Sequence, residues 1–436
     1  MKKLVFLVLV LFIAAPYLVS YTPAKVLFTK LLEHKFQNSV QIDTLRLSWF
    51  GPQQAQNIRF QNKDFDGVVE TFTSPLPLWK LPDLKESFSI ENGTVQVHAP
   101  GYPAAQINHL HAVVNGPKVE ATATTTEADK TGSLKVRAEQ QNADYDITAM
   151  ATNVPSLLVD RLVNAHGKLA ALVGPSMNGT LSVKTNNRSG TIALDIDGTN
   201  TDASGTFDYT PDTITLKEPL LVTCHLTPES STLLLGTKVQ SQTPILLRVF
   251  PEGFSMSRPF SIDKLQIGHA TLDLGKFQVE NTAPLSALFN MLKSQRSGQW
   301  VSAWFNEVDA TMQNGTLSLG RVDALFAGNV HLCAWGDILL SQDKLAMNLG
   351  IPADTLKSAF GIQNLNDNYV LKVPVQGTLQ NPEFVTGPAS AKIATMAAAQ
   401  AVPKPGPVGT FFGIINAATN DSSDVPPAKR PFPWEK

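Results

Sequence analysis

The chain has 436 residues, a formal net charge of −2 and only 17% charged residues. Proteins that bind nucleic acid concentrate Lys and Arg against the phosphates. This sequence has no basic cluster beyond Lys2 and Lys3, so we expect no nucleic-acid partner. The length allows two or three domains, or one elongated β-rich unit.

Residues 1–21 predict an uncleaved signal-anchor. Lys2 and Lys3 precede an unbroken apolar run over 4–15, and a helix of about 18 residues reaches roughly 27 Å, close to a hydrocarbon core of about 30 Å. By the positive-inside rule, the lysines stay cytoplasmic and the rest of the chain crosses the membrane. A cleaved signal peptide is the alternative. The predicted anchor residues are Leu4, Leu7, Leu11 and Phe12.

Residues 22–39 have apolar side chains at helical spacing, which predicts an amphipathic helix beside the membrane. From Val40 the apolar period becomes two, which predicts a β-rich domain over 40–387. Gly51 and Pro52 mark a turn after the first strand. The residues that carry the alternation in the first two strands are Leu45, Leu47, Trp49, Ile58 and Phe60.

Short alternating segments continue through the middle of the chain, with turn signals about every ten residues. This pattern predicts a large antiparallel sheet with one apolar face, and it does not fit βαβ units. Asn92 and Gly93 predict a turn between two of the strands.

Few helices interrupt the strands. The predicted ranges are 155–163, 284–308, 353–360 and 388–401. Trp300, Trp304 and Phe305 fall in the second helix and are expected to pack on a sheet, with a membrane-interface or partner-facing patch as the alternative. Residues 388–420 are expected to form C-terminal helical segments, and the Pro-rich range 421–436 a disordered tail.

No catalytic motif is present: the sequence has no phosphate-binding loop, no nucleophile elbow and no zinc-binding helix. We therefore expect neither an enzyme nor a cofactor. His331 and Cys333 share one face of a strand, and Cys224 is next to His225; packing explains these residues better than a metal site. A loose calcium loop is the other candidate, formed by Asp195, Asp197, Asn200 and Asp202. A solvated strand face explains those residues better, so no metal is predicted.

The two cysteines, Cys224 and Cys333, are expected to be free side chains within strands. One disulfide between them is the alternative in an oxidising compartment.

Two blocks of the sequence resemble a known family. Residues 349–362 and 369–382 read as a short helix followed by a strand that ends in Val-x-Gly-Thr-Leu-x-Asn-Pro, and residues 40–52 resemble an opening strand pair. These blocks are similar to the AsmA-like family of bacterial envelope proteins, which includes the TamB and YdbH groups. The residues that match the family's turn motif are Gly377, Thr378, Asn381 and Pro382.

The resemblance implies a long, curled antiparallel β-sheet groove, anchored in the bacterial inner membrane by a single pass and facing the periplasm. It also implies phospholipid movement toward the outer membrane, or a part in outer-membrane assembly with other envelope proteins. A dry groove can hold acyl chains without a catalytic residue, because burying each CH2 is worth about 0.8 kcal/mol. Leu45, Leu47, Trp49, Ile58 and Phe60 are the predicted groove residues. A structural or assembly module without lipid cargo is the alternative function.

Overall fold

The computed structural model describes most of the chain as β-strands. The described residues are 39–61, 65–77, 79–80, 87–98, 105–127, 130–142, 144–162, 165–292, 298–363, 365–379, 381–401 and 424–435. Their 25 strands are paired antiparallel and helices are few, which confirms the mainly β prediction. The chain divides into two compact units, Met1–Asp202 and Ala203–Lys436.

The predicted anchor, with Leu4, Leu7, Leu11 and Phe12, lies outside the described residues, as does all but the last residue of the predicted amphipathic helix. Within the residues that are described, no helix has the length and apolar character needed to cross a bilayer.

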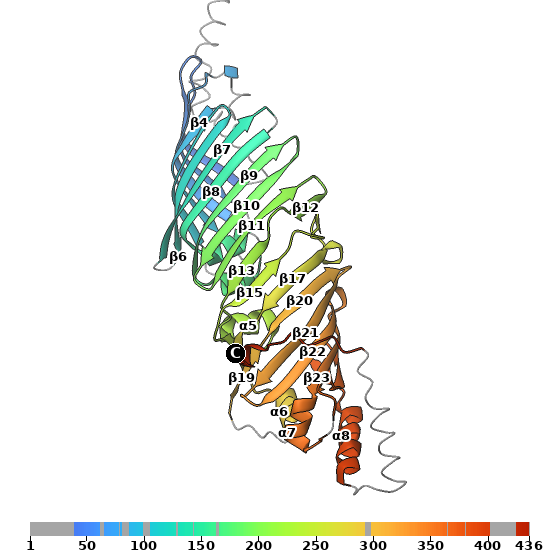
Figure 1. The fold of residues 1–436 in the computed structure, drawn as a ribbon. Coiled ribbons are helices and arrows are strands. Elements are labelled where there is room, and N and C mark those ends of the chain that lie inside the picture. Colours follow the sequence, from blue (N-terminus) through green and yellow to red (C-terminus); the bar gives the residue numbers. More distant parts are fainter. Residues whose placement is uncertain are drawn as a thin grey trace, which may run out of the picture. The chain divides into compact units, whose positions relative to one another are not determined.

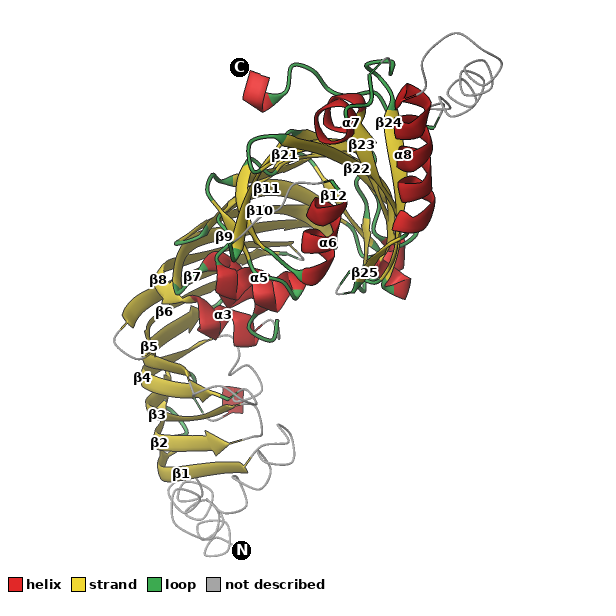
Figure 2. Ribbon diagram, turned by 90° about the horizontal axis from the view of Figure 1, so that it is seen from below, coloured by secondary structure: helices red, strands yellow, loops and turns green. Residues whose placement is uncertain are grey.

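The first unit contains an antiparallel meander in which each strand pairs with the next (Figures 1 and 2). Alternating apolar and polar residues drive this arrangement, because every strand then presents one apolar side to the same face. The strands are β1 (Ser39–Arg46), β2 (Gln53–Gln61), β3 (Phe65–Ser74), β4 (Ser87–Val97), β5 (Ala105–Asn115), β6 (Lys118–Glu127), β7 (Lys130–Gln141), β8 (Asp144–Pro155), β9 (Ser176–Asn186) and β10 (Ser189–Gly198).

Three residues with left-handed backbone conformation lie side by side in this meander. They are Asn57 in β2 (φ 52°), Asn92 in β4 (φ 55°) and His109 in β5 (φ 50°). Val69 and Thr71 of β3 pair with the neighbours of Asn57 on one side and of Asn92 on the other, and His109 Nδ1 contacts Asn92 Oδ1 at 3.1 Å. The three positions therefore form one line across the strands.

This line changes which sequence positions face the apolar side. In β4 the apolar residues are Phe88 and Ile90 before Asn92, but Val95 and Val97 after it. A single left-handed residue rotates the strand, so that the apolar side stays on one face although the spacing in the sequence changes. The predicted Asn92-Gly93 turn is thus wrong: both residues lie inside the single strand β4, where the local irregularity is a bulge and not a hairpin.

We expect Asn57→Val to lower the free energy of unfolding by about 1–2 kcal/mol, because a Cβ in the left-handed region contacts the following carbonyl oxygen and a β-branched residue tolerates this poorly. Urea unfolding provides the measurement. Gln56→Val is the matched control, since Gln56 is an exposed neighbour in β2 without positive φ. Equal losses in the two variants would contradict the role of Asn57.

Two short helices follow β8, α3 (Ser156–Leu162) and α4 (Lys168–Val173). The first confirms the helix predicted over 155–163, and it contacts β4, β8 and β9. Leu158 is 1% exposed and packs with residues of the sheet, among them Ile107 and Leu134. Helix α3 therefore covers one end of the apolar face of the sheet.

The second unit has shorter strands and most of the helices. Its strands are β11 (Thr201–Tyr209, which begins at the unit boundary), β12 (Thr213–Leu216), β13 (Leu220–Cys224), β14 (Val239–Ser241), β15 (Ile245–Val249), β16 (Met256–Ser257), β17 (Ile267–Asp273), β18 (Lys276–Glu280), β19 (Trp300–Phe305), β20 (Glu307–Gln313), β21 (Thr316–Phe326), β22 (Val330–Leu339), β23 (Lys344–Pro352), β24 (Val370–Gly377) and β25 (Pro382–Phe384). Its helices are α5 (Pro228–Leu235), α6 (Ala283–Met291), α7 (Ala353–Phe360) and α8 (Thr386–Ala401), with 3-10 turns η2 (Ile262–Lys264), η3 (Leu340–Gln342) and η4 (Pro433–Glu435).

The largest core among the described residues lies in this unit, between α6, α7, α8 and the strands β22 to β24. Ile351, Leu356 and Val373 are fully buried there. Figure 2 shows α7 and α8 beside β23 and β24, in agreement with the contacts of α8 with β24 and of α7 with β22 and β23. The helices predicted over 353–360 and 388–401 are confirmed as α7 and α8.

The helix predicted over 284–308 is wrong in its second half. Helix α6 ends at Met291, and Trp300, Trp304 and Phe305 belong to strand β19. The residues from Trp300 to Phe305 are rich in aromatic and β-branched side chains, which favour a strand once β18 and β21 offer hydrogen-bonding edges.

The C-terminal range also differs from the disordered tail that the sequence predicts. Residues 424–435, here called the C-terminal segment, pack on the second unit. Phe432 is 1% exposed, and Val425 packs against Cys333, Trp335 and Val370. Composition alone favours disorder for a Pro-rich polar range. Here, however, the apolar residues Val425 and Phe432 are packed on the second unit.

Candidate functional site

A continuous row of apolar residues crosses all ten strands of the first unit. Each member pairs directly with a member on the neighbouring strand. In strand order this apolar row consists of Leu45, Ala55, Phe72, Ile90, Ala112, Ala121, Val136, Ala149, Leu181 and Leu194.

A second row runs beside it from β4 to β10. Its members also pair strand by strand, and they are Phe88, Val114, Val119, Ala138, Ile147, Val183 and Ile192. We call the two rows together the apolar face. The alternate positions carry charged side chains, with ion pairs such as Arg137 to Glu120 at 3.4 Å and Lys118 to Glu139 at 3.8 Å. The sheet is therefore apolar on one side and solvated on the other.

The apolar face is closed at its first strands and open further along. Leu45 and Ala55 are each 5% exposed, whereas Leu181 is 38% exposed, and the row members from β3 to β8 are half-buried. Among the described residues, α3 covers only one end of this face. Apolar side chains thus remain partly exposed on many neighbouring strands. A contiguous apolar patch of this kind is typical of an interaction surface.

The predicted groove residues lie at the closed end of the first unit. Leu45 and Leu47 are 5% and 7% exposed and form a small core with Val40, Ile42 and Ala55. Ile58 packs against this core, and Trp49 and Phe60 are half-buried. Leu45 belongs to the apolar row, so the predicted residues are continuous with the face, although the half-exposed members lie on later strands.

The apolar face is chemically uniform over its later strands. Six strands, β5 to β10, span about 24 Å at roughly 4.8 Å per strand, which exceeds the thickness of one leaflet of a hydrocarbon core, about 15 Å. Along this length the two rows contain only aliphatic side chains. Burial of such a surface against another apolar group is favourable and needs no directional polar contact.

The second unit contains a buried charged network. Arg321 donates to both carboxylate oxygens of Asp323 at 2.7 to 3.1 Å, and Asp323 is fully buried. His331 contacts Asp323 through Nε2 at 3.0 Å and Asp354 through Nδ1 at 2.7 Å. The N–H of Asp323 donates to Oδ1 of Asn306, between β19 and β20, at 2.7 Å. The network thus connects strands β21 and β22 and the residue between β19 and β20 with helix α7.

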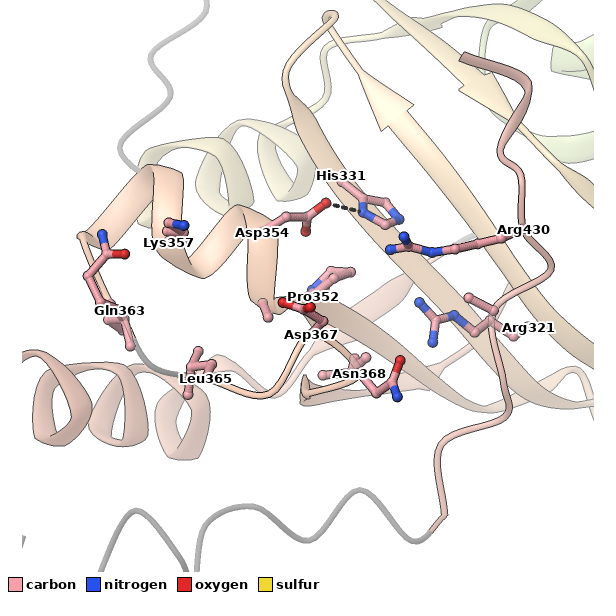
Figure 3. A pocket seen from close by; sticks show the side chains of 14 residues that line it. Arg321, His331, Pro352, Asp354, Lys357, Gln363, Leu365, Asp367, Asn368 and Arg430 are labelled. Carbon is pink, nitrogen blue, oxygen red and sulfur yellow. Dashed lines mark hydrogen bonds and ion pairs between the residues drawn. The ribbon is translucent and has the colours of Figure 1, made fainter. Parts of the chain in front are cut away.

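A cavity of about 380 Å³ lies beside this network. Figure 3 shows Arg321 and Arg430 on the side of His331, and Lys357 of α7 across from them. The described residues that line the cavity include no Ser, Thr or Cys, and burial raises the pKa of the nearby Cys333 thiol to about 12. The described lining of the cavity therefore offers charged and imidazole groups, and it includes no hydroxyl or thiol nucleophile.

The C-terminal segment covers the network. Phe432 and Trp434 contact the His331 ring edge-on, with ring centroids 5.0 and 5.7 Å away, and Arg321 donates to the carbonyl of Pro426 at 3.3 Å. Burial alone would lower the pKa of His331, but its hydrogen bonds to Asp323 and Asp354 and their negative charges outweigh this effect and raise the pKa above 6.5. Burial likewise acts to raise the pKa of Asp354, but the hydrogen bond and charge of His331, together with the N–H of Thr355 and the charge of Arg430, lower this pKa below its usual value.

We expect the second unit to lose stability as the pH rises through the raised pKa of His331. The group titrates near 6.5 in the unfolded chain, so its stabilising effect is complete below that pH and disappears above the folded pKa. Urea unfolding at about pH 6 and about pH 9 measures the difference. His331→Gln should remove the part of this difference that His331 contributes, while His269→Gln, at a side chain 47% exposed, should retain it. The same pH dependence in wild type and His331→Gln would contradict the prediction.

The other residues singled out in the sequence have local structural surroundings. Gly377 (φ 94°) ends β24 and pairs with Pro382, and Thr378 and Asn381 bond to each other across the turn at 3.1 and 3.2 Å. The described residues of this motif are therefore held together by hydrogen bonds at the end of β24. Cys224 and Cys333 are free and lie in strands, as predicted.

Asp195 and Asp197 are exposed on β10, and Asp197 accepts from Asn178 at 3.2 Å. Across the described residues, no group of three or more His, Cys, Asp or Glu side chains is placed to hold a metal ion.

Sequence reasoning missed Arg321 and Asp323 as members of a site. The available signal was the presence of two opposite charges two residues apart in a strand, which places both side chains on the same face of the sheet. No protein-family model, no curated protein and no solved structure matches this chain. The functional proposal therefore rests on the structure of the chain itself.

Proposed function

We propose that this is an inner-membrane-anchored protein of the bacterial periplasm, whose apolar face binds phospholipid acyl chains and supports lipid transfer between the envelope membranes. The observation that carries the proposal is the apolar row, which runs in register across all ten strands of the first unit and is half-exposed over most of them. A fold that needed only a core would cover such a face with helices or a second sheet.

An acyl chain lying along the apolar row would bury its methylene groups at about 0.8 kcal/mol each. Because the contacts are the same from strand to strand, a bound chain gains little by staying at one position and can shift along the row. The sequence has no phosphate-binding loop, so movement would follow a concentration gradient or the action of a partner. The curled groove and the other envelope proteins implied by the family resemblance are part of this proposal.

Photo-crosslinking of the full chain with a phospholipid that carries a diazirine on its acyl chain tests the proposal. Mass spectrometry then maps the adducts, which separates lipid on the apolar face from lipid around residues 1–21. We expect adducts on residues of β5 to β10 that belong to the two rows. No adduct there, with adducts on the N-terminal residues alone, would overturn the proposal.

Two neighbouring residues of β8 provide a matched pair of variants. Ala149 belongs to the apolar row, whereas Thr148 pairs with Arg137 and Ser182 on the opposite face. We expect Ala149→Asp to reduce the adducts on β5 to β10 by about tenfold or more, because a bound chain would have to desolvate the carboxylate. Thr148→Asp should leave them unchanged. Circular dichroism confirms that both variants retain the sheet.

A structural or assembly module without cargo is the second candidate. It is favoured by the small core around Leu45 and Leu47 and by the packing of α3, since both cover part of the face with residues of the same chain. A folded protein without adducts on the apolar face would favour this function.

A further inference from the structure

Two aromatic side chains project into solvent at one end of the first unit. Phe50 lies between β1 and β2 and is 85% exposed, and Trp79 lies after β3 and is 52% exposed. Their rings meet edge-on, with centroids 5.2 Å apart. Because β1 and β3 both end at this edge of the meander, the two loops lie side by side. We call the pair the aromatic tip.

A buried glutamine holds both loops in place. Gln53 is 3% exposed, and its amide donates to the carbonyl oxygens of Ser48 (2.8 Å), Gly51 (2.9 Å) and Leu76 (3.0 Å). Its Oε1 accepts from the N–H of Ser48 at 2.9 Å. One side chain thus ties the Phe50 loop to the segment that leads to Trp79, so the exposed rings are presented on an ordered support.

The size of the aromatic tip indicates what kind of partner it fits. Two aromatic side chains bury at most about 500 Å², whereas a stable protein interface needs about 800 Å² on each side. A bilayer needs no matching surface, and its interface favours Trp and other aromatic rings with a cation nearby. Lys80, next to Trp79, is exposed and supplies such a cation. Its backbone N–H donates to the carbonyl oxygen of Pro77 in the same loop at 2.9 Å.

We propose that the aromatic tip inserts into the interfacial region of a lipid bilayer and sets the position of the first unit on the membrane. The inference rests on the proposed membrane anchoring, but it does not require lipid on the apolar face. The chain length permits this contact. The 17 residues of the range 22–38 reach about 26 Å as the predicted helix and up to about 56 Å when extended, while β1, which ends just before the tip, is about 26 Å long.

Fluorescence quenching by brominated lipid tests the proposal on the full chain in phosphatidylcholine vesicles. The protein has six tryptophans, and none precedes Trp49, so the predicted anchor contributes no signal. Trp49 is replaced by Phe throughout, which leaves Trp79 as the first tryptophan of the chain. We expect quenching by bromines on the upper part of the acyl chains, and its loss on further replacement Trp79→Phe. Trp335→Phe, at a residue 6% exposed, should leave the quenching unchanged.

Phe50→Ser provides the second variant, because an 85% exposed ring that meets the exposed ring of Trp79 can be removed without opening a buried core. The quenching of Trp79 should decrease in this variant, whereas Phe260→Ser, at a ring 60% exposed in the second unit, should have no effect. Quenching that does not depend on Trp79 would overturn the proposal and leave a protein as the partner of the tip. Acyl-chain adducts on β5 to β10 report on the apolar face separately, so failure of either proposal can be told from failure of the other.

Discussion

Asp323→Asn should lower the free energy of unfolding of the second unit by about 3–5 kcal/mol, the usual effect of removing one partner from a buried ion pair. Asp323 is fully buried and holds Arg321 and His331 at the same time. Asn keeps the shape of the side chain but leaves the Arg321 guanidinium, whose side chain is 7% exposed, without its countercharge. The size of the loss follows from the difficulty of solvating a buried cation.

Urea unfolding monitored on the second unit measures this change. Asp337→Asn is the control, since Asp337 lies on the neighbouring strand β22, is exposed, and bonds to Ser318 at 2.6 Å. A surface substitution of that kind changes stability by about 0.5 kcal/mol at most. A loss below about 1 kcal/mol in Asp323→Asn would mean that Arg321 finds another partner, and would contradict the assigned role of Asp323.

Phe432→Ala should release the C-terminal segment from the second unit. Truncation of a buried Phe costs about 3–5 kcal/mol, and Phe432 is the most buried side chain of this segment. The other links include two ion pairs with exposed members, Lys429 to Asp309 at 2.6 Å and Lys372 to Asp424 at 3.2 Å, each worth about 0–1 kcal/mol. These pairs alone are too weak to hold the segment.

Limited proteolysis followed by mass spectrometry measures the release. The segment contains Lys429, which is followed by Arg430. Trypsin should cleave the bond after Lys429 at least about tenfold faster in Phe432→Ala than in wild type, because cleavage follows the population of the detached form. Phe260→Ala is the matched control, since that ring is 60% exposed. Cleavage at the wild-type rate in Phe432→Ala would show that other contacts hold the segment.

Much of the fold could be predicted from local patterns. Alternation of the kind seen at Leu134, Val136 and Ala138 predicts a strand with one apolar side wherever the period is two, and the structure places these residues in β7. The prediction failed where one residue changes the phase. Asn92 and Gly93 have the sequence of a hairpin turn, but the neighbouring strands β3 and β5 continue past them.

The candidate site was harder to predict from the sequence than the fold. Each member of the apolar row is an ordinary strand residue, and only the pairing register shows that Ala149 lies between Val136 and Leu181. Likewise, Asp354 and Asp323 are separated by 31 positions in the chain, and only the packing of α7 against β22 brings both to His331.

The sequence by itself determined the β-rich class, the apolar and polar sides of most strands, and helices α3, α7 and α8, because these depend on periodicity and capping signals over a few neighbouring residues. The tertiary structure alone decided that Trp300 to Phe305 form a strand, that the C-terminal segment packs around Phe432, and that ten apolar residues align in one row. Those outcomes depend on which edges, surfaces and registers the rest of the chain makes available, and this information is not contained in any short stretch of sequence.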